Sequence, residues 1–168
     1  MKLKTNYLVL ALLLLSSAGL AQNKVKVGLS GSLQGSQYGI SVPCWAGPKT
    51  VIAPFIDFRY GESIGTDFSV GMETRFYLKT EKIRPYYGFK LGAAFNIPSS
   101  ENTINDNTTI DGVAGIAFGG EYFISENFSV GIEAQGNLTK SAEDSDRYGN
   151  PGGINFNTAT RVSATIYF

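Results

Sequence analysis

The segment FSVGIEAQGNLT, residues 128–139, alternates between apolar and polar residues almost without error. Side chains of a β-strand point alternately to its two sides, so this alternation predicts a strand with one apolar and one polar face. The apolar face would carry Phe128, Val130, Ile132, Ala134, Gly136 and Leu138. In a water-soluble barrel the apolar face turns inward, whereas in a membrane-spanning barrel it turns outward to lipid. The direction of this face therefore decides the class of protein.

The same period of two recurs in seven other segments, which are separated by clusters of Gly, Asn, Asp, Ser and Pro. These segments span residues 24–33, 37–45, 50–60, 68–79, 86–97, 112–124 and 156–168. An even number of strands of about 9–11 residues, joined alternately by short turns and longer polar loops, is typical of transmembrane barrels. The pattern predicts an all-β fold, a closed eight-stranded antiparallel up-and-down transmembrane β-barrel.

The N-terminus predicts an export signal. Lys2 and Lys4 precede the apolar run at residues 8–15, and small residues follow up to Ala21. A basic start, a short apolar core and small residues at a cleavage point are typical of a signal peptide. We expect a cleaved signal peptide at residues 1–21 and a barrel domain at residues 22–168. The alternative is an N-terminal anchor helix, which would need about 20 apolar residues.

The charged residues indicate which face lies inside. They gather on the polar faces, as Lys26, Asp57, Arg59, Glu73, Arg75, Lys90, Glu121, Glu133 and Arg161. So many charges would be costly in the core of a soluble protein, but in a membrane barrel they can pair across the lumen. An eight-stranded barrel is just wide enough for side chains to fill. We therefore expect Glu73, Glu121 and Glu133 to pair with Arg59, Arg75, Lys90 or Arg161 and to plug the lumen.

Aromatic residues fall near both ends of the apolar faces, as expected for the two membrane interfaces. Trp45 is interpreted as one of these interfacial residues. The sequence ends on a strand with Phe168, and Ile166 lies two residues before it on the same face. This pair resembles the C-terminal signature by which outer-membrane proteins are recognised for assembly.

The sequence resembles the small eight-stranded outer-membrane barrels of the OmpA, OmpX and OmpW type. The resemblance is carried by RFYLKTEKIRPYYGFKLGAAF, residues 75–95, and by GGEYFISENFSVGIEAQGN, residues 119–137. It implies a location in the outer membrane of a Gram-negative-type bacterium, with outer-membrane lipid and the barrel-assembly machinery as partners. Extracellular surface partners would contact the loops at residues 99–111 and 141–155.

The composition argues against several kinds of chemistry. The chain has no histidine, and its single cysteine, Cys44, falls on the apolar face. No catalytic, cofactor-binding or metal-binding residue is predicted, although Glu121 and Glu133 offer an alternative acid–base pair. Without Lys2 and Lys4, 12 basic residues remain against 14 acidic ones, so no basic field for nucleic acid exists. A narrow conduit for small solutes and a soluble lipocalin-like ligand binder stay open as alternative functions.

Overall fold

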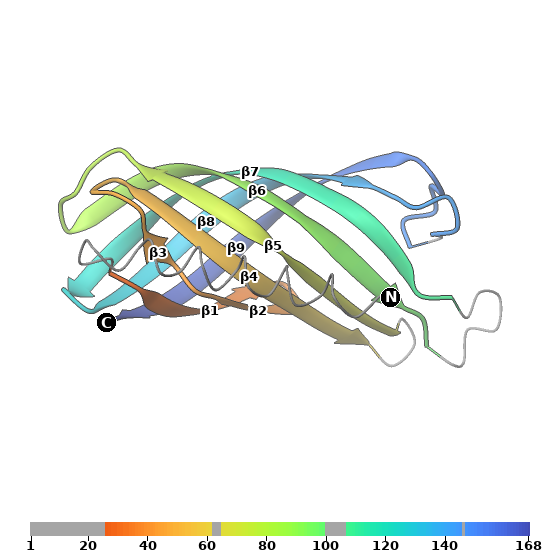
Figure 1. Ribbon diagram of the computed structural model, residues 1–168, viewed down its shortest axis with the longest axis horizontal. Helices are drawn as coiled ribbons and strands as arrows, with labels where there is room; N and C mark the ends of the chain where they lie inside the picture. Colours follow the sequence, from red (N-terminus) through yellow and green to blue (C-terminus); the bar gives the residue numbers. More distant parts are fainter. Residues whose placement is uncertain (1–25, 62–64, 100–106, 146) are drawn as a thin grey trace, which may run out of the picture.

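The segments in which apolar and polar residues alternate form one antiparallel sheet that closes on itself (Figure 1). The computed structural model describes residues 26–61, 65–99, 107–145 and 147–168. The strands in these residues are β1 (Gly28–Gln34), β2 (Gln37–Ser41), β3 (Cys44–Trp45), β4 (Thr50–Gly61), β5 (Gly65–Tyr77), β6 (Ile83–Ile97), β7 (Thr109–Ser125), β8 (Phe128–Lys140) and β9 (Ile154–Tyr167). β2 and β3 pair in turn with β4, and β1 pairs with β9. β2 and β3 therefore share one strand position, and the predicted closed eight-stranded barrel is confirmed.

The strand predicted at residues 37–45 is interrupted. Pro43 lies in the gap between β2 and β3, where its missing N–H removes a donor from the ladder. The neighbouring backbone groups still find partners, because Gly28 N donates to Pro43 O at 2.8 Å and Val42 N donates to Pro54 O at 3.0 Å. The barrel wall thus stays closed across the interruption.

Several strands are longer than the alternation predicted. β5 begins at Gly65, β6 at Ile83 and β7 at Thr109, so each includes residues that the sequence analysis assigned to turns or loops. The predicted signal peptide at residues 1–21 lies outside the described residues, as do residues 100–106 of the loop predicted at 99–111. Within the described ranges no helix is long and apolar enough to cross a membrane.

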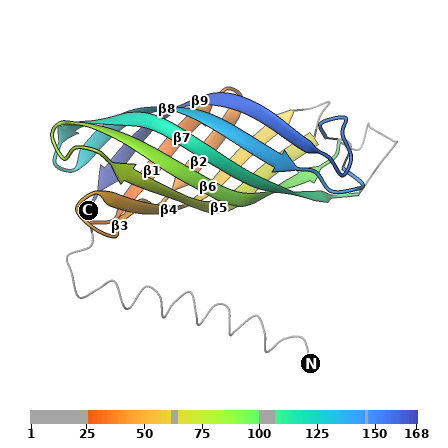
Figure 2. The same cartoon turned by 90° about the horizontal axis from the view of Figure 1, so that it is seen from above.

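The two ends of the barrel differ. The short turns at residues 46–49, 78–82 and 126–127 lie at one end together with the C-terminus, and we call this the short-turn end (Figures 1 and 2). The opposite, long-loop end carries the segments between β6 and β7 and between β8 and β9. The β1–β2 hairpin stops early there, at a turn in which Gly35 has a φ of +58°. β9 pairs with β1 only as far as Val162, so the wall is lower beside the rest of β9.

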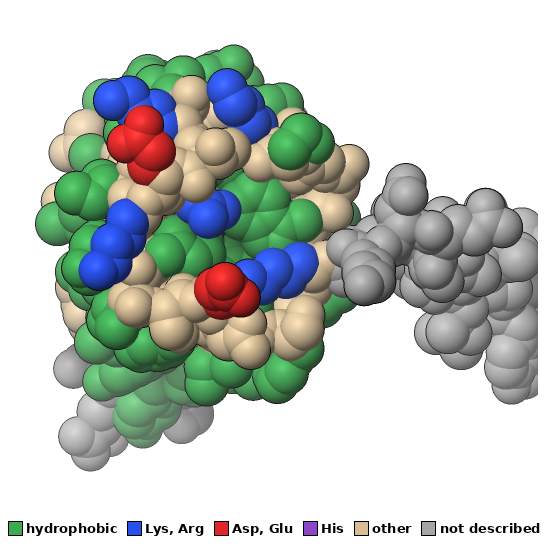
Figure 3. Space-filling model, turned by 90° about the vertical axis from the view of Figure 1, so that its left-hand side faces the viewer, with side chains coloured by type: hydrophobic (Ala, Val, Ile, Leu, Met, Phe, Trp, Pro, Cys, Tyr) green, Lys and Arg blue, Asp and Glu red, His purple; other side chains and the backbone are tan. Residues whose placement is uncertain are grey.

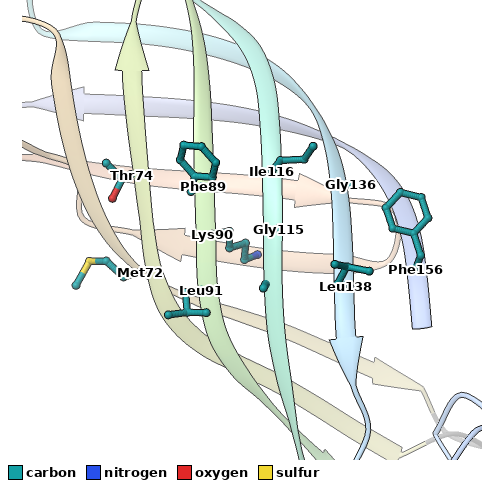
Figure 4. Close-up of a pocket in the computed structure, with 11 residues that line it drawn as sticks. Met72, Thr74, Phe89, Lys90, Leu91, Gly115, Ile116, Gly136, Leu138 and Phe156 are labelled. Carbon is teal, nitrogen blue, oxygen red and sulfur yellow. The ribbon is translucent and has the colours of Figure 1, made fainter. Parts of the chain in front are cut away.

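The apolar faces turn outward. In β8, Ile132 is 60% exposed whereas its neighbour Glu133 is 2% exposed. The same holds around the barrel, where the exposed large side chains include Leu33, Ile40, Ile56, Phe58, Phe89, Leu91, Phe118, Leu138, Phe156 and Val162. On the outer face of β5 to β9, four of them border an apolar depression of about 650 Å³, namely Phe89, Leu91, Leu138 and Phe156 (Figure 4). Gly136 forms part of it, with the ring of Phe156 lying 3.3 Å from where a Cβ would stand.

The polar faces turn inward and are tightly packed near the short-turn end. Tyr86 projects into the lumen, and a Cβ on the facing Gly119 would lie 2.7 Å from its ring. Glycine at this position therefore makes room for a large aromatic side chain inside a narrow barrel.

Candidate functional site: the charged lumen

Aromatic side chains close the lumen at the short-turn end. Trp45 stacks on Tyr77 with ring centroids 5.0 Å apart, and Phe123 stacks on Tyr167 at 5.7 Å. The guanidinium of Arg84 lies 3.9 Å from the Phe123 centroid and 5.4 Å from that of Trp45. Trp45 was interpreted from the sequence as an interfacial belt residue, and that interpretation is wrong because its ring lies inside the barrel.

Lys and Arg side chains surround this aromatic layer on the rim (Figure 3). The basic residues placed here by the strand ends are Lys26, Lys49, Lys79, Lys82 and Arg84. The acidic residues are Glu81 and Glu126. The ammonium groups of Lys26 and Lys82 each lie 5.2 Å from a tyrosine centroid, Tyr167 and Tyr122 respectively. This rim is therefore basic, with cations held against aromatic faces.

Behind the aromatic layer lies a neutral cluster of two acids and two bases, Glu73, Arg75, Glu133 and Arg161. Arg75 Nε donates to Glu73 Oε1 at 2.6 Å and lies 4.0 Å from Glu133 Oε2. Arg161 Nη2 lies 2.7 Å from Glu133 Oε1 and also donates to Glu73. All four side chains are buried. Such a cluster is stable only when every charge has partners, and here each one does.

The second carboxylate oxygen of Glu133 is held by a neutral donor. Tyr86 Oη donates to Glu133 Oε2 at 2.8 Å, and Gln135 Nε2 donates to Oε1 at 2.5 Å. The Arg75 guanidinium also lies 5.2 Å from the centroid of the Tyr86 ring. These contacts fix the four-charge cluster in one arrangement across the barrel.

Glu121 differs from the prediction. No Lys or Arg of the described residues lies within ion-pair distance of it, whereas the sequence analysis expected a basic partner. Its carboxylate instead accepts hydrogen bonds from the hydroxyls of Tyr77, Ser129 and Tyr167, the last at 3.0 Å. It lies nearer the aromatic layer than the four-charge cluster, where tyrosine hydroxyls are the donors at hand.

The remaining predicted residues pair with aspartates. Lys90 Nζ lies 2.8 Å from Asp57 Oδ2, and this pair lies on the long-loop side of the four-charge cluster. Arg59 Nε donates to Asp67 Oδ2 at 2.9 Å, and Arg147 of the β8–β9 segment donates to the same oxygen. The glutamate partners expected for Arg59 and Lys90 are therefore replaced by Asp67 and Asp57.

Asp67 and Asp111 are lumen residues that the sequence analysis assigned to connecting segments. Asp111 is fully buried and accepts from Asn96 Nδ2 at 2.8 Å, from Ala142 N at 2.9 Å and from Ser145 Oγ at 3.2 Å. It therefore ties the β8–β9 segment to the barrel wall. The sequence did carry a signal for Asp111. It lies an even number of residues before Glu121, so the two side chains share one face of β7.

The other predicted residues lie on the outer face. Ile166 and Phe168 project outward at the short-turn end and are exposed. Cys44 pairs with Ile52, an exposed outward residue, so its thiol lies on the outer face as expected. Among the described residues no group of three or more His, Cys, Asp or Glu side chains is arranged to hold a metal ion.

The fold and lumen define a class of structure, the closed eight-stranded barrel with an apolar exterior and a charged interior. No protein-family model matches the chain, and no curated protein matches it. The N-terminal β-barrel domain of Pseudomonas aeruginosa OprF matches with a TM-score of 0.64 and 16% identity, over 86% of this chain and 96% of that one. Neisserial surface protein A (NspA) matches with a TM-score of 0.56 and 12% identity, over 86% and 94%.

The outer membrane enzyme PagL also aligns, over 84% of this chain and 98% of that one at 13% identity, but its TM-score of 0.44 carries no argument about this chain. At these identities the comparisons show the fold alone. The chain has the barrel fold of small outer-membrane proteins, as the resemblance implied.

Proposed function

We propose that this chain is an integral outer-membrane protein of a Gram-negative-type bacterium, exported by its signal peptide. The observation that carries the proposal is the inversion of its faces. Large apolar side chains are exposed on the outside, and ionised side chains are buried within. Exposed apolar surface of this extent is unfavourable in water and favourable in a bilayer. In a soluble lipocalin-like barrel the two faces would be exchanged.

The proposed role is non-enzymatic: a closed barrel that presents its long-loop end to the cell surface. The four-charge cluster and the aromatic layer fill the section near the short-turn end, which supports a plugged lumen. Absence of histidine from the sequence and the engagement of Glu73 and Glu133 by arginines support a structural role for these acids. Surface partners would contact the segments around residues 99–111 and 141–155, while Ile166 and Phe168 would engage the assembly machinery.

Heat-modifiable migration tests the membrane proposal. The unboiled protein from an outer-membrane fraction should migrate apart from the boiled protein on a denaturing gel, because a closed barrel resists detergent until heated. A single band from a soluble fraction would overturn the proposal. Conductance across planar bilayers then separates the plugged barrel from the alternative conduit: the plugged barrel predicts no steady current, whereas a conduit predicts discrete open levels.

A further inference from the structure

The half of the lumen nearest the long-loop end contains a polar cavity of about 410 Å³. A deeper cavity of about 80 Å³ adjoins it. The two share the lining residues Gln34, Gln37, Ser69, Ala94, Tyr148 and Asn157. We call them together the polar cup. Sites for small molecules measure about 300–1,000 Å³, so the cup has room for one small ligand.

The cup exists because the inward side chains become small above the four-charge cluster. Ser69, Gly92, Ala94 and Val113 line this part of the barrel, where the lower section holds arginines, glutamates and tyrosines. Its floor is the Lys90–Asp57 pair, with the Lys90 ammonium 4.1 Å from the Phe55 centroid. Because the β1–β2 hairpin is short, the barrel wall is lower on that side of the cup. Gly35 and Ser36, in the turn of the hairpin, line this edge.

The charges that line the cup are already compensated within the protein. Asp57 is paired with Lys90, and Asp67 is paired with both Arg59 and Arg147. The buried Asp111 lies close to Asp67, so the two arginines face two aspartates and the local charges sum to zero. An ionic ligand would therefore find no unpaired counter-charge among the described residues that line the cup. The groups that remain are side-chain amides and hydroxyls, which both donate and accept hydrogen bonds.

One of these groups is buried without a partner. Asn137 lines the deeper part of the cup and is only 7% exposed. Its Oδ1 accepts no hydrogen bond from any described residue. This oxygen is closed off from the cavity, because it packs against Gly115, where a Cβ would stand 2.3 Å from it. A ligand in the cup would therefore be held by the other amides and hydroxyls of the wall.

We propose that the polar cup binds one neutral, hydroxyl-rich ring of monosaccharide size. Amides and hydroxyls of the wall pair with the hydroxyls of such a ring, and the exposed Tyr148 ring offers an apolar surface to its C–H face. A free hexose and the terminal residue of a longer glycan present this same chemistry. The inference goes beyond the proposed function, because the cup lies above the plugged section and binding requires neither insertion nor conduction.

The test is titration of the full chain, folded in detergent micelles, with glucose, galactose and mannose and with a trisaccharide ending in each. Asn157→Ala removes an amide that lines both parts of the cup and should weaken binding by about tenfold. Ala159→Phe fills the cup from β9 without removing a polar side chain and should abolish binding. Glu126→Gln, at the opposite end of the barrel, is the matched control and should bind as the unaltered protein does. Heat-modifiable migration checks that each variant is folded.

Saturable binding of a free hexose that Ala159→Phe abolishes supports the proposal and identifies a soluble sugar as ligand. Binding of a trisaccharide alone supports it with a surface glycan as the source. No saturable binding of any of these sugars, or equal binding by Ala159→Phe, would overturn it. Sugar binding by a chain recovered in a soluble fraction would overturn the outer-membrane proposal and leave the cup as a sugar site.

Discussion

Arg161 bridges Glu73 and Glu133 across the lumen, with its Nη2 atom 2.7 Å from Glu133 Oε1 and hydrogen-bonded to Glu73 Oε2. The three side chains come from β9, β5 and β8, so the contact joins opposite parts of the barrel wall. All three are at most 4% exposed. At this depth water cannot replace a lost partner, and the cluster responds strongly to removal of any one charge.

Arg161→Ala should lower the free energy of unfolding by about 3–5 kcal/mol, because it leaves a carboxylate of the cluster buried without its cation. Lys140→Ala is the matched control. Lys140 is exposed and donates to the carbonyl of Gly152, so its loss should change stability by at most about 0.5 kcal/mol. Urea unfolding in lipid vesicles measures both, and equal midpoints would contradict the placement of Arg161 in the cluster.

Glu73→Gln and Glu121→Gln should differ although both acids are buried. Glu73 is held by two arginines, so its neutralisation leaves an excess of positive charge and should cost about 3–5 kcal/mol. Glu121 is held by three hydroxyls, which can donate to or accept from an amide, so its cost should be about 1 kcal/mol. The same unfolding measurement compares them, and a larger loss for Glu121→Gln would refute the assigned partners.

Trp45 is the single tryptophan of the chain and should report an interior position. Lipids brominated on their acyl chains quench tryptophans that touch lipid, so Trp45 in the lumen should be quenched little. A variant carrying Trp45→Phe and Tyr122→Trp places the indole on the outer face near the same end and should be quenched more strongly. Equal quenching of the two proteins would contradict the position of Trp45 in the lumen and indicate that it lies in the interfacial belt.

The two faces of each strand could be predicted from the sequence because a period of two leaves few choices. Ile132 and Glu133 are adjacent, and only one of them can turn inward. The alternation also placed Trp45 on the same face as Gln37 and Ser41, but its position near a rim led to the interpretation as a belt residue. Its actual place depends on stacking with Tyr77, a contact between β3 and β5 that no local pattern reveals.

The ion-pair partners within the lumen could not be predicted either, because they too depend on contacts between strands that no local pattern reveals. Alternation gives the face of a residue, but its height along the barrel depends on strand register and tilt. Asp57 and Lys90 lie 33 residues apart, and their meeting depends on the register of β4, β5 and β6. Asp67 and Asp111 were missed because the strands extend beyond the segments in which apolar residues alternate regularly. The buried oxygen of Asn137 required the full lumen packing to appear.

The central claim, that the apolar outer face of the barrel contacts lipid, is tested most directly by an arginine placed at two depths on one strand. Leu91, 69% exposed in the middle of β6, and Ile83, 63% exposed at its short-turn end, face the same side. In a bilayer, Leu91→Arg should lower the free energy of unfolding by about 2–4 kcal/mol and Ile83→Arg by about 0–1 kcal/mol. Equal and small effects in lipid vesicles would contradict a membrane-facing exterior.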